Sequence, residues 1–383
     1  MKITAIHATP VNIPYRRSAL MSAGLNDQST RTIVEVHTDA GITGLGDCSY
    51  AFAAGVIEHE FAPALVGLDP RAGAELRRYC LPDHIDFGTP LLKARVAAWG
   101  GVDIALWDLI GKADGVPVYE LLGGALREAA PFVSYAYSPP DAARAPGQLA
   151  ELARQSVALS GASIFEFKVG VHDVEVDIAT VRAVHAALAG CAHIAIDANM
   201  GMALPAARHL LGEVAPLLEN VEEPVESLHE MEQLALEYNV NVSAHCADLD
   251  AVRFYPHVAV VPTLDACGGI TGVRRLAHAL GAAGRRMWLR SHAESGIGWA
   301  AIVHLGIGTA ELARPAQSLI DLISEDLVLG ERWDVRAGGV RAPAVPGLGV
   351  QLDRSALHAC HELFRKRGEV PAFTPALRRS GLC

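Results

Sequence analysis

The chain has 383 residues, of which 51% are hydrophobic and 20% carry charge, a balance that excludes a disordered, collagen-like or coiled-coil protein. Its formal net charge of −11 argues against a nucleic-acid-binding protein, because such proteins present a basic surface to the phosphates. The length suits a barrel of about 250 residues with a second structural unit beside it.

No apolar run reaches the roughly 18 residues that a membrane-spanning helix needs. The first residues alternate like a strand and lack the apolar core of a signal peptide. The seven cysteines are widely spaced without a CxxC pair, which excludes a zinc ribbon and favours reduced thiols. We therefore expect a cytoplasmic protein with neither a membrane nor a nucleic-acid partner.

The N-terminal part of the chain predicts a unit in which strands precede helices. Residues 1–15 alternate as a strand, and residues 31–48 have the pattern of a hairpin. The small, polar stretch 21–30 between them predicts a loop. Residues 55–125 carry apolar side chains mostly at helical spacing. This segregation favours a separate α+β domain over residues 1–128.

From residue 129 the pattern changes to a repeated alternation of strand and helix. Eight short apolar runs follow one another, and amphipathic helical patterns separate most of them. The alternation predicts a (β/α)8 barrel over residues 129–340. The last segment, 341–383, begins rich in Gly and Pro and is expected to return to the N-terminal unit.

Polar side chains stand where several of these strands end, which is where a barrel places its catalytic groups. On the second strand, Glu166 and Lys168 are two residues apart and therefore share a face. Buried charges are rare unless they are paired or bind a metal, so a structural ion pair is the alternative for any single one. The strand ends predict one site with the polar residues Glu166, Lys168, Asp197, Asn199, Glu222, Glu223, His245, Ser291, His292 and Glu294.

Four short motifs follow one another along the chain: ALWDLIGKADGVPVYELLGG at 105–124, DAN at 197–199, EEP at 222–224 and GGIT at 268–271. In this order and spacing the chain resembles the mandelate racemase and muconate lactonizing enzyme branch of the enolase superfamily, over nearly its whole length. The resemblance implies an α/β fold, namely a modified (β/α)8 TIM barrel with an α+β capping domain built from both chain ends.

The resemblance also implies a chemistry, the abstraction of the proton α to a carboxylate through an enediolate intermediate. In such enzymes a divalent metal, most often Mg²⁺, binds the substrate carboxylate and stabilises the developing charge. By the same resemblance, Asp197 and Glu222 hold the metal and Lys168 is the base. The expected substrate is a small carboxylic acid, and the expected assembly is a homo-oligomer.

Two positions depart from the family pattern. The first lysine of the family's KxK motif is Glu166 here, and the fifth strand ends without the expected carboxylate. His245 or Asp248 is then expected as the third metal ligand, and a histidine ligand would make a transition metal suitable. Charge counting suggests another arrangement, in which Glu166 completes the metal site beside Asp197 and Glu222.

The seventh strand offers His292, which matches the family's acid–base histidine. The aspartate that supports this histidine in the racemase branch is replaced by Thr263, and Asp265 lies two residues out of register. We therefore expect His292 to be less basic and less well oriented, but still able to protonate a leaving hydroxyl. Glu294 resembles an acid of the same loop in the lactonizing branch. The alternative for His292 is a core or rim histidine, and the alternative for Glu294 is a solvated charge at the rim.

Together these features predict a metal-dependent lyase that dehydrates a small hydroxy or sugar acid, with Lys168 as base, His292 as acid and residues 21–30 as a lid. A racemase, epimerase or cycloisomerase of the same family is one alternative. A barrel that only binds a carboxylate ligand, without catalysis, is another. Phosphate-cradling and nucleophilic-serine chemistry lack support, because GxxxxGK[ST], GxGxxG and GxSxG are absent.

Overall fold

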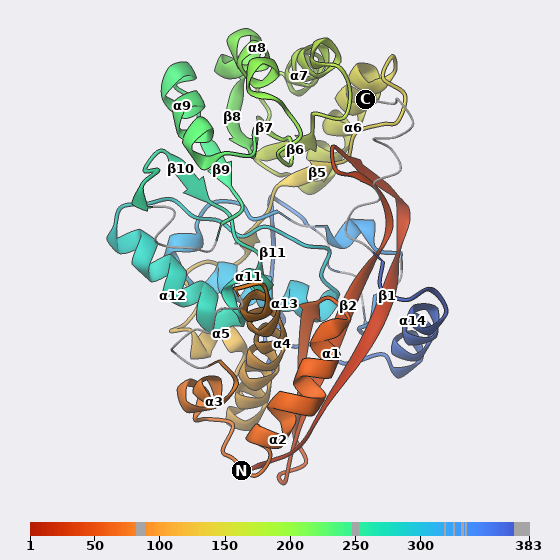
Figure 1. The fold of residues 1–383 in the computed structure, drawn as a ribbon, viewed down its shortest axis with the longest axis vertical. Helices are drawn as coiled ribbons and strands as arrows, with labels where there is room; N and C mark the ends of the chain where they lie inside the picture. The colour runs from red at the N-terminus through yellow and green to blue at the C-terminus, as the bar shows by residue number, and fades with distance from the viewer. Residues whose placement is uncertain are drawn as a thin grey trace.

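The computed structural model describes residues 1–81, 89–246, 253–317, 319–324, 326–330, 333 and 335–370. An antiparallel sheet opens the chain with β1 (Ile3–Met21), β2 (Gly24–Thr38) and β3 (Thr43–Ser49). β1 and β2 pair over most of their length, and the long ribbon that they form reaches from the N-terminal unit to the barrel (Figure 1).

The predicted loop over residues 21–30 is wrong for most of its length. β1 continues to Met21 and β2 starts at Gly24, so the turn itself is short. Cross-strand partners such as Ala19 and Asn26 extend the ladder through the polar stretch. A polar sequence can remain extended here because the paired backbone satisfies its own hydrogen bonds.

Helices follow the sheet: α1 (Phe52–Val56), a π-helical segment (Ile57–Phe61), α2 (Ala62–Leu65), α3 (Gly73–Cys80), α4 (Thr89–Asp114) and α5 (Val118–Leu121). α4 lies so close to β3 that the strand requires glycine. A Cβ on Gly46 would lie 1.9 Å from the Gly101 carbonyl oxygen, and one on Gly44 would lie 2.0 Å from the Ala105 oxygen. This close approach lets the strands and the long helix share one apolar core.

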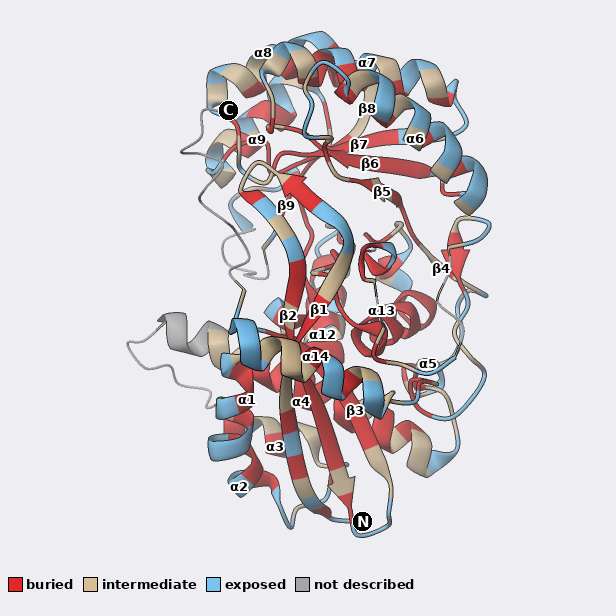
Figure 2. Cartoon of the chain, turned by 90° about the vertical axis from the view of Figure 1, so that its right-hand side faces the viewer, coloured by how far each residue is buried: buried red, intermediate tan, exposed pale blue. Residues whose placement is uncertain are grey.

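Six parallel strands form most of the barrel, and they neighbour one another in chain order. They are β5 (Ser134–Ala136), β6 (Ile164–Lys168), β7 (His193–Asp197), β8 (Leu218–Glu222), β9 (Val242–Ala244) and β10 (Val258–Val260). The helices of the barrel are α6 (Ala145–Ser160), α7 (Val174–Leu188), α8 (Leu204–Val214), α9 (Leu228–Tyr238), α11 (Leu264–Cys267) and α12 (Gly269–Ala282). Figure 2 shows β6–β8 buried beneath α6–α8, whose outer faces are exposed.

The alternation of side chains along β6 decides what the barrel interior contains. Phe165 and Phe167 pack in the apolar core between the strands and the outer helices. Their neighbours Glu166 and Lys168 therefore point to the opposite face, into the barrel.

Backbone hydrogen bonds close the barrel through two further segments. The bonds are Trp288 N to Val260 O (3.3 Å), Gln317 N to Leu289 O (3.0 Å) and Val133 N to Ala316 O (2.9 Å). The segments around Leu289 and Ala316 thus take the seventh and eighth positions and link β10 back to β5. The predicted fold class, a modified TIM barrel with a capping domain, is confirmed.

The remaining elements are α13 (Gly296–Gly308), β4 (Ala130–Pro131), β11 (Gly339–Val340), α14 (Arg354–Arg367) and the 3₁₀ segments Ala215–Leu217, Ala310–Leu312 and Ile320–Leu322. α14 lies against β1 (Figure 2), and His361 Nδ1 of this helix is 2.7 Å from the Pro10 oxygen. The boundaries of the predicted domains, at residues 128 and 340, stay a prediction. None of the described helices is both long and apolar enough to span a bilayer.

Candidate active site

A cavity of about 500 Å³ lies between the carboxyl ends of the barrel strands and the β1–β2 ribbon. The barrel side of its lining includes Lys168, Asn199, Glu223, His245, Arg290 and His292, and the ribbon side includes Tyr15, Gln28 and Ser29. The ribbon tip is held at the barrel because Ser22 Oγ donates to the Ala198 carbonyl oxygen at 2.7 Å. The cavity is therefore bounded by both structural units.

Three carboxylates from neighbouring strands meet beside this cavity: Glu166 of β6, Asp197 of β7 and Glu222 of β8. Each offers an oxygen within 4.8 Å of the other two, the one such acidic group among the residues that the structure describes. In the strand register Asp197 lies opposite Glu222 and opposite Lys168, and Glu166 is the preceding residue on the same face of β6 as Lys168. Burial raises the pKa of Glu166, and the charge of Asp197 raises it further. We call this cluster the acidic triad.

Lys168 lies between the acidic triad and the cavity. Its ammonium is 2.5 Å from Asp197 Oδ2 and 5.7 Å from the centre of the Tyr135 ring. Burial lowers the pKa of Lys168 to about 8, although Asp197 acts in the opposite direction. A lysine with this pKa can release its proton near neutral pH and so could act as a base.

Arg290, at the end of the seventh barrel segment, is a site residue that sequence reasoning missed. Its guanidinium contacts both Asp197 and Glu222. Burial opposes the ionisation of Asp197, but Arg290 and Lys168 outweigh it and lower the pKa of Asp197 to about 2. The available signal was the position of Arg290 two residues before His292, which places both side chains on one strand face.

His292 does have a carboxylate partner, contrary to the expectation from the sequence. Ser49 Oγ lies 3.0 Å from His292 Nδ1 and donates to Asp265 Oδ2, while His292 Nδ1 and Asp265 Oδ2 are 3.9 Å apart. Asp265 reaches this point because the chain turns directly into α11 after Thr263, whose hydroxyl caps that helix. The helical turn thus compensates for the shift of two residues.

Arg31 of β2 fixes this arrangement from the capping side. Its guanidinium donates to Ser49 Oγ at 2.8 Å and to the His292 carbonyl oxygen at 3.2 Å, and it pairs with Asp47 at 2.9 Å. Burial raises the pKa of Asp265, but Arg31 and His292 reverse the effect and lower it. Asp265 is therefore held as an anion close to the histidine.

The other predicted site residues occupy different positions. Glu294 is buried within its loop, where it accepts from Ser291 Oγ at 2.6 Å and from His292 N at 2.9 Å, and it is not among the described residues of the cavity lining. His245 is exposed and lines the cavity outside the acidic triad. Asp248 lies outside the described residues.

Glu223 is a further titratable group of the cavity. Burial raises its pKa to about 7, helped by the charge of Asp197. Its backbone has φ of 45°, a conformation that few residues other than glycine adopt. Such strain is often found in residues that line functional sites.

The acidic triad can hold a metal ion. Carboxylate oxygens are the ligands that hard divalent cations prefer, and the three buried carboxylates are close enough to share one ion. Glu166, the third metal ligand that charge counting suggested, belongs to this group. His245, the alternative third ligand, does not.

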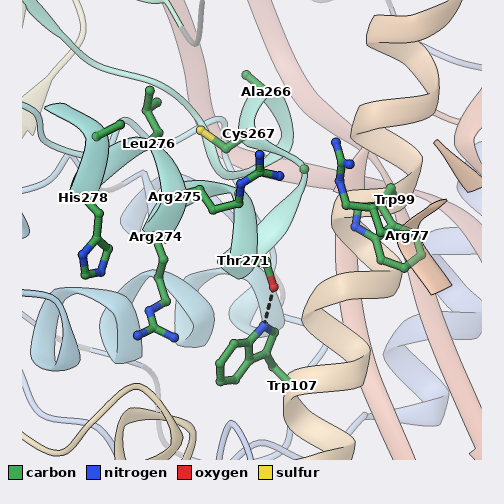
Figure 3. A pocket seen from close by; sticks show the side chains of 13 residues that line it. Arg77, Trp99, Trp107, Ala266, Cys267, Thr271, Arg274, Arg275, Leu276 and His278 are labelled. Atoms are coloured by element: carbon green, nitrogen blue, oxygen red, sulfur yellow. Dashed lines mark hydrogen bonds between the residues drawn. The ribbon is translucent and has the colours of Figure 1, made fainter. Parts of the chain in front are cut away.

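A second cavity of about 680 Å³ lies between α4 and α12 (Figure 3). Arg274 lies 5.8 Å from the Trp107 ring and donates to the Leu122 oxygen at 3.3 Å. His278 lies 3.6 Å from Glu311. Because these basic side chains already contact protein groups, we assign this cavity no function.

Comparisons with known proteins agree with this geometry. Residues 3–123 match the mandelate racemase / muconate lactonizing enzyme N-terminal domain, and residues 148–356 match the enolase C-terminal domain-like family. The probable glucarate dehydratase of Streptomyces coelicolor is 28% identical, covering 94% of this chain and 91% of that protein.

Two further relatives cover almost the whole chain. The N-succinyl-L-Arg/Lys racemase of Bacillus cereus is 27% identical, covering 93% of this chain and 97% of that protein. The structure of an enolase from Mycobacterium smegmatis complexed with tartrate is 26% identical and superposes with a TM-score of 0.86, covering 96% of this chain and 93% of that one. The chain is therefore an enzyme of the mandelate racemase and muconate lactonizing enzyme family, within the enolase superfamily.

Proposed function

We propose that the enzyme dehydrates a small hydroxy or sugar acid by removing the proton α to its carboxylate. One observation carries the proposal: Lys168 of β6 and His292 of the seventh barrel segment line one cavity beside the acidic triad. A base and an acid on one cavity are what an elimination of water requires. The relation to a probable glucarate dehydratase supports the same reaction.

Lys168 is assigned the role of the base. In its neutral form it accepts the α proton, leaving the electron pair on an enediolate intermediate. Because the pKa of Lys168 is about 8, a fraction of the lysine is neutral near neutral pH and can accept a proton. Asp197, 2.5 Å from the ammonium, favours the charged lysine that the step produces.

His292 is assigned the role of the acid. Its side chain is 41% exposed, on the cavity side, and its Nδ1 is tied to Asp265 through Ser49. The imidazolium donates a proton to the hydroxyl on the neighbouring carbon as the enediolate electrons expel it. Water leaves, and in a substrate whose α carbon carries a hydroxyl of its own the product is an enol, which tautomerises to a 2-keto acid.

Glu166, Asp197 and Glu222 would hold a divalent cation, which we propose to be Mg²⁺ because all three donors are hard oxygens. When bound, this ion supplies a positive charge that stabilises negative charge on the substrate carboxylate. Burial of the triad favours the same stabilisation, because Glu166, Asp197 and Glu222 are at most 3% exposed and water is largely excluded from them.

A racemase or epimerase is the second candidate, and the presence of two acid–base groups on one cavity favours it. If His292 returned a proton to the α carbon instead of protonating a hydroxyl, the configuration would invert. The relation to an N-succinyl-L-Arg/Lys racemase supports this candidate. A barrel without catalysis is less well supported, because Glu166, whose charge motivated it, belongs to the acidic triad.

The test incubates the chelator-treated enzyme, resupplied with Mg²⁺, with a panel of hydroxy and sugar acids in D₂O. Dehydration predicts a 2-keto acid, detected as its semicarbazone, whereas racemisation predicts deuterium at the α carbon of both configurations by NMR. Lys168→Met should abolish either signal, and Lys112→Met, a matched change at a lysine paired with Asp108 outside the cavity, should not. Absence of both signals with every acid would refute the proposed function.

The cellular location and the assembly also stay predictions. We propose a cytoplasmic homo-oligomer with a small carboxylic acid as its ligand. Sedimentation of the purified protein tests the assembly, and a monomer at micromolar concentration would contradict it.

A further inference from the structure

We propose that Arg290 is a displaceable internal counter-ion that competes with the divalent metal ion for the acidic triad. The proposal concerns the resting state of the enzyme and its affinity for metal. It rests on the proposed function only in that it takes the acidic triad to be the metal site.

The positions of the groups make the two cations mutually exclusive. The guanidinium of Arg290 contacts Asp197 and Glu222, and oxygens of these carboxylates lie within 4.8 Å of one from Glu166. A divalent ion shared by the carboxylates would lie about 2.0–2.6 Å from their oxygens. Guanidinium nitrogens bind carboxylates at about 2.7–2.9 Å. Both cations would therefore need the same space between the strands.

The charges of the buried groups support an exchange between the two cations. The triad residues are at most 3% exposed and Arg290 is 9% exposed, so uncompensated charge is costly there. Three ionised carboxylates with Lys168 alone leave two negative charges. Arg290 reduces the excess to one, and a divalent ion in its place removes it. Together the two cations would leave the site positive, before a substrate carboxylate binds.

Two further observations indicate that Glu166 is fixed in place and that Arg290 can move. Gln317 Nε2 donates to Glu166 Oε1 at 2.5 Å and so holds Glu166 in the acidic triad whichever cation is present. Arg290 lines the cavity of about 500 Å³, which offers its side chain room to withdraw. Glu166 on β6 and Arg290 on the seventh segment therefore belong to the same buried cluster of charges.

The decisive measurement is Mn²⁺ binding to the full chain after chelator treatment, followed by electron paramagnetic resonance of free Mn²⁺. Arg290→Met and Arg290→Gln should lower the dissociation constant at least tenfold, because no internal cation opposes the metal. Arg314→Met is the matched control, since Arg314 pairs with Glu219 and stacks on Trp288 away from the cavity, and it should leave the constant unchanged. Unchanged or weaker binding by both Arg290 variants would overturn the proposal, as would no Mn²⁺ binding by any variant.

A second measurement covers variants that fold poorly. Crystals of the unmodified enzyme soaked in Mn²⁺ should show an anomalous peak between the three carboxylates, with Arg290 withdrawn from Asp197 and Glu222. A peak elsewhere, or Arg290 still contacting both, would overturn the proposal. If Mn²⁺ behaves as expected while the D₂O test detects no chemistry, the proposed function fails and the competition stands.

Discussion

Glu166 and Lys168 are two residues apart on β6, and burial acts on their charges in opposite senses. It raises the pKa of the carboxyl group and lowers that of the ammonium to about 8, because both charged forms lose hydration. Asp197 restrains the effect on the lysine by its negative charge and increases the effect on the glutamate. On this strand face the pKa values of the two groups are thus shifted toward each other, compared with their values in water.

This shift predicts how activity depends on pH. The base must be neutral, so the rate of α-proton exchange with D₂O, the step that depends on Lys168, should be low at pH 6, rise with pH, and level off above about 8. Lys168→Met should lower kcat/KM by about 10²–10⁴-fold, the usual contribution of general base catalysis. Initial rates from pH 6 to 9.5 check both statements. A flat profile between pH 6 and 8 would count against Lys168 as the base.

The contacts that link His292 through Ser49 to Asp265 predict that elimination of the hydroxyl can be slowed without slowing removal of the α proton. Ser49→Ala removes the hydroxyl that contacts both partners and should slow elimination by roughly tenfold, because His292 loses its orientation. Removal of the α proton depends on Lys168 and should continue. The ratio of deuterium exchange to keto-acid formation in D₂O should therefore rise. An unchanged ratio would show that the link does not serve the acid step.

At the scale of elements, the β1–β2 ribbon is what turns the open barrel mouth into a cavity. Its tip carries Ser22, which contacts the loop that follows β7. Gly201 in that loop leaves room for the contact, since a Cβ there would lie 2.3 Å from Ser22 Cβ. The position of the ribbon over the site therefore depends on the absence of one side chain.

Gly201→Ala is expected to lift the ribbon tip and raise KM by roughly fivefold or more, with a smaller effect on kcat. Ser22→Ala, which removes the hydroxyl that donates to the Ala198 oxygen, should raise KM in the same direction. Gly55→Ala is a matched control, since a Cβ there meets nothing within 4 Å. An unchanged KM in Gly201→Ala would contradict this explanation.

On the scale of the whole molecule, buried polar contacts tie the capping sheet to the barrel. Asp47 of β3 accepts from Ser295 N and Oγ at 2.8 Å, at the start of α13, and pairs with Arg31. Arg31 in turn holds the His292 carbonyl oxygen. The contacts that join the two units thus also position the loop that carries His292.

Asp47→Ala should lower the free energy of unfolding by up to about 3–5 kcal/mol, because the buried guanidinium of Arg31 loses its carboxylate partner at 2.9 Å and keeps the more distant Asp265, at 3.6 Å. Urea denaturation measures the loss. Asp114→Ala is the control, since Asp114 forms an exposed pair with Arg71 and such pairs contribute at most about 1 kcal/mol. Equal losses in both variants would contradict a special role of the Asp47 contact.

The amino-acid sequence by itself determined the features that depend on local pattern and spacing. Alternating strand and helix predicted the barrel, and side-chain alternation placed Glu166 and Lys168 together on its inner face. The spacing of one βα unit brought Asp197 and Glu222 to the same mouth, because parallel strands end at one edge. These inferences need only the periodicity of the chain and the direction of its strands.

The tertiary structure alone decided which distant groups touch. Arg290 meets carboxylates about seventy and ninety residues before it, and Ser49 joins Asp265 to His292 across the boundary between the two units. The ribbon over residues 21–30 exists because a partner strand satisfies its backbone, which local polarity does not reveal. Such contacts depend on packing and on charge compensation in a buried site, and neither has a local signature in the sequence.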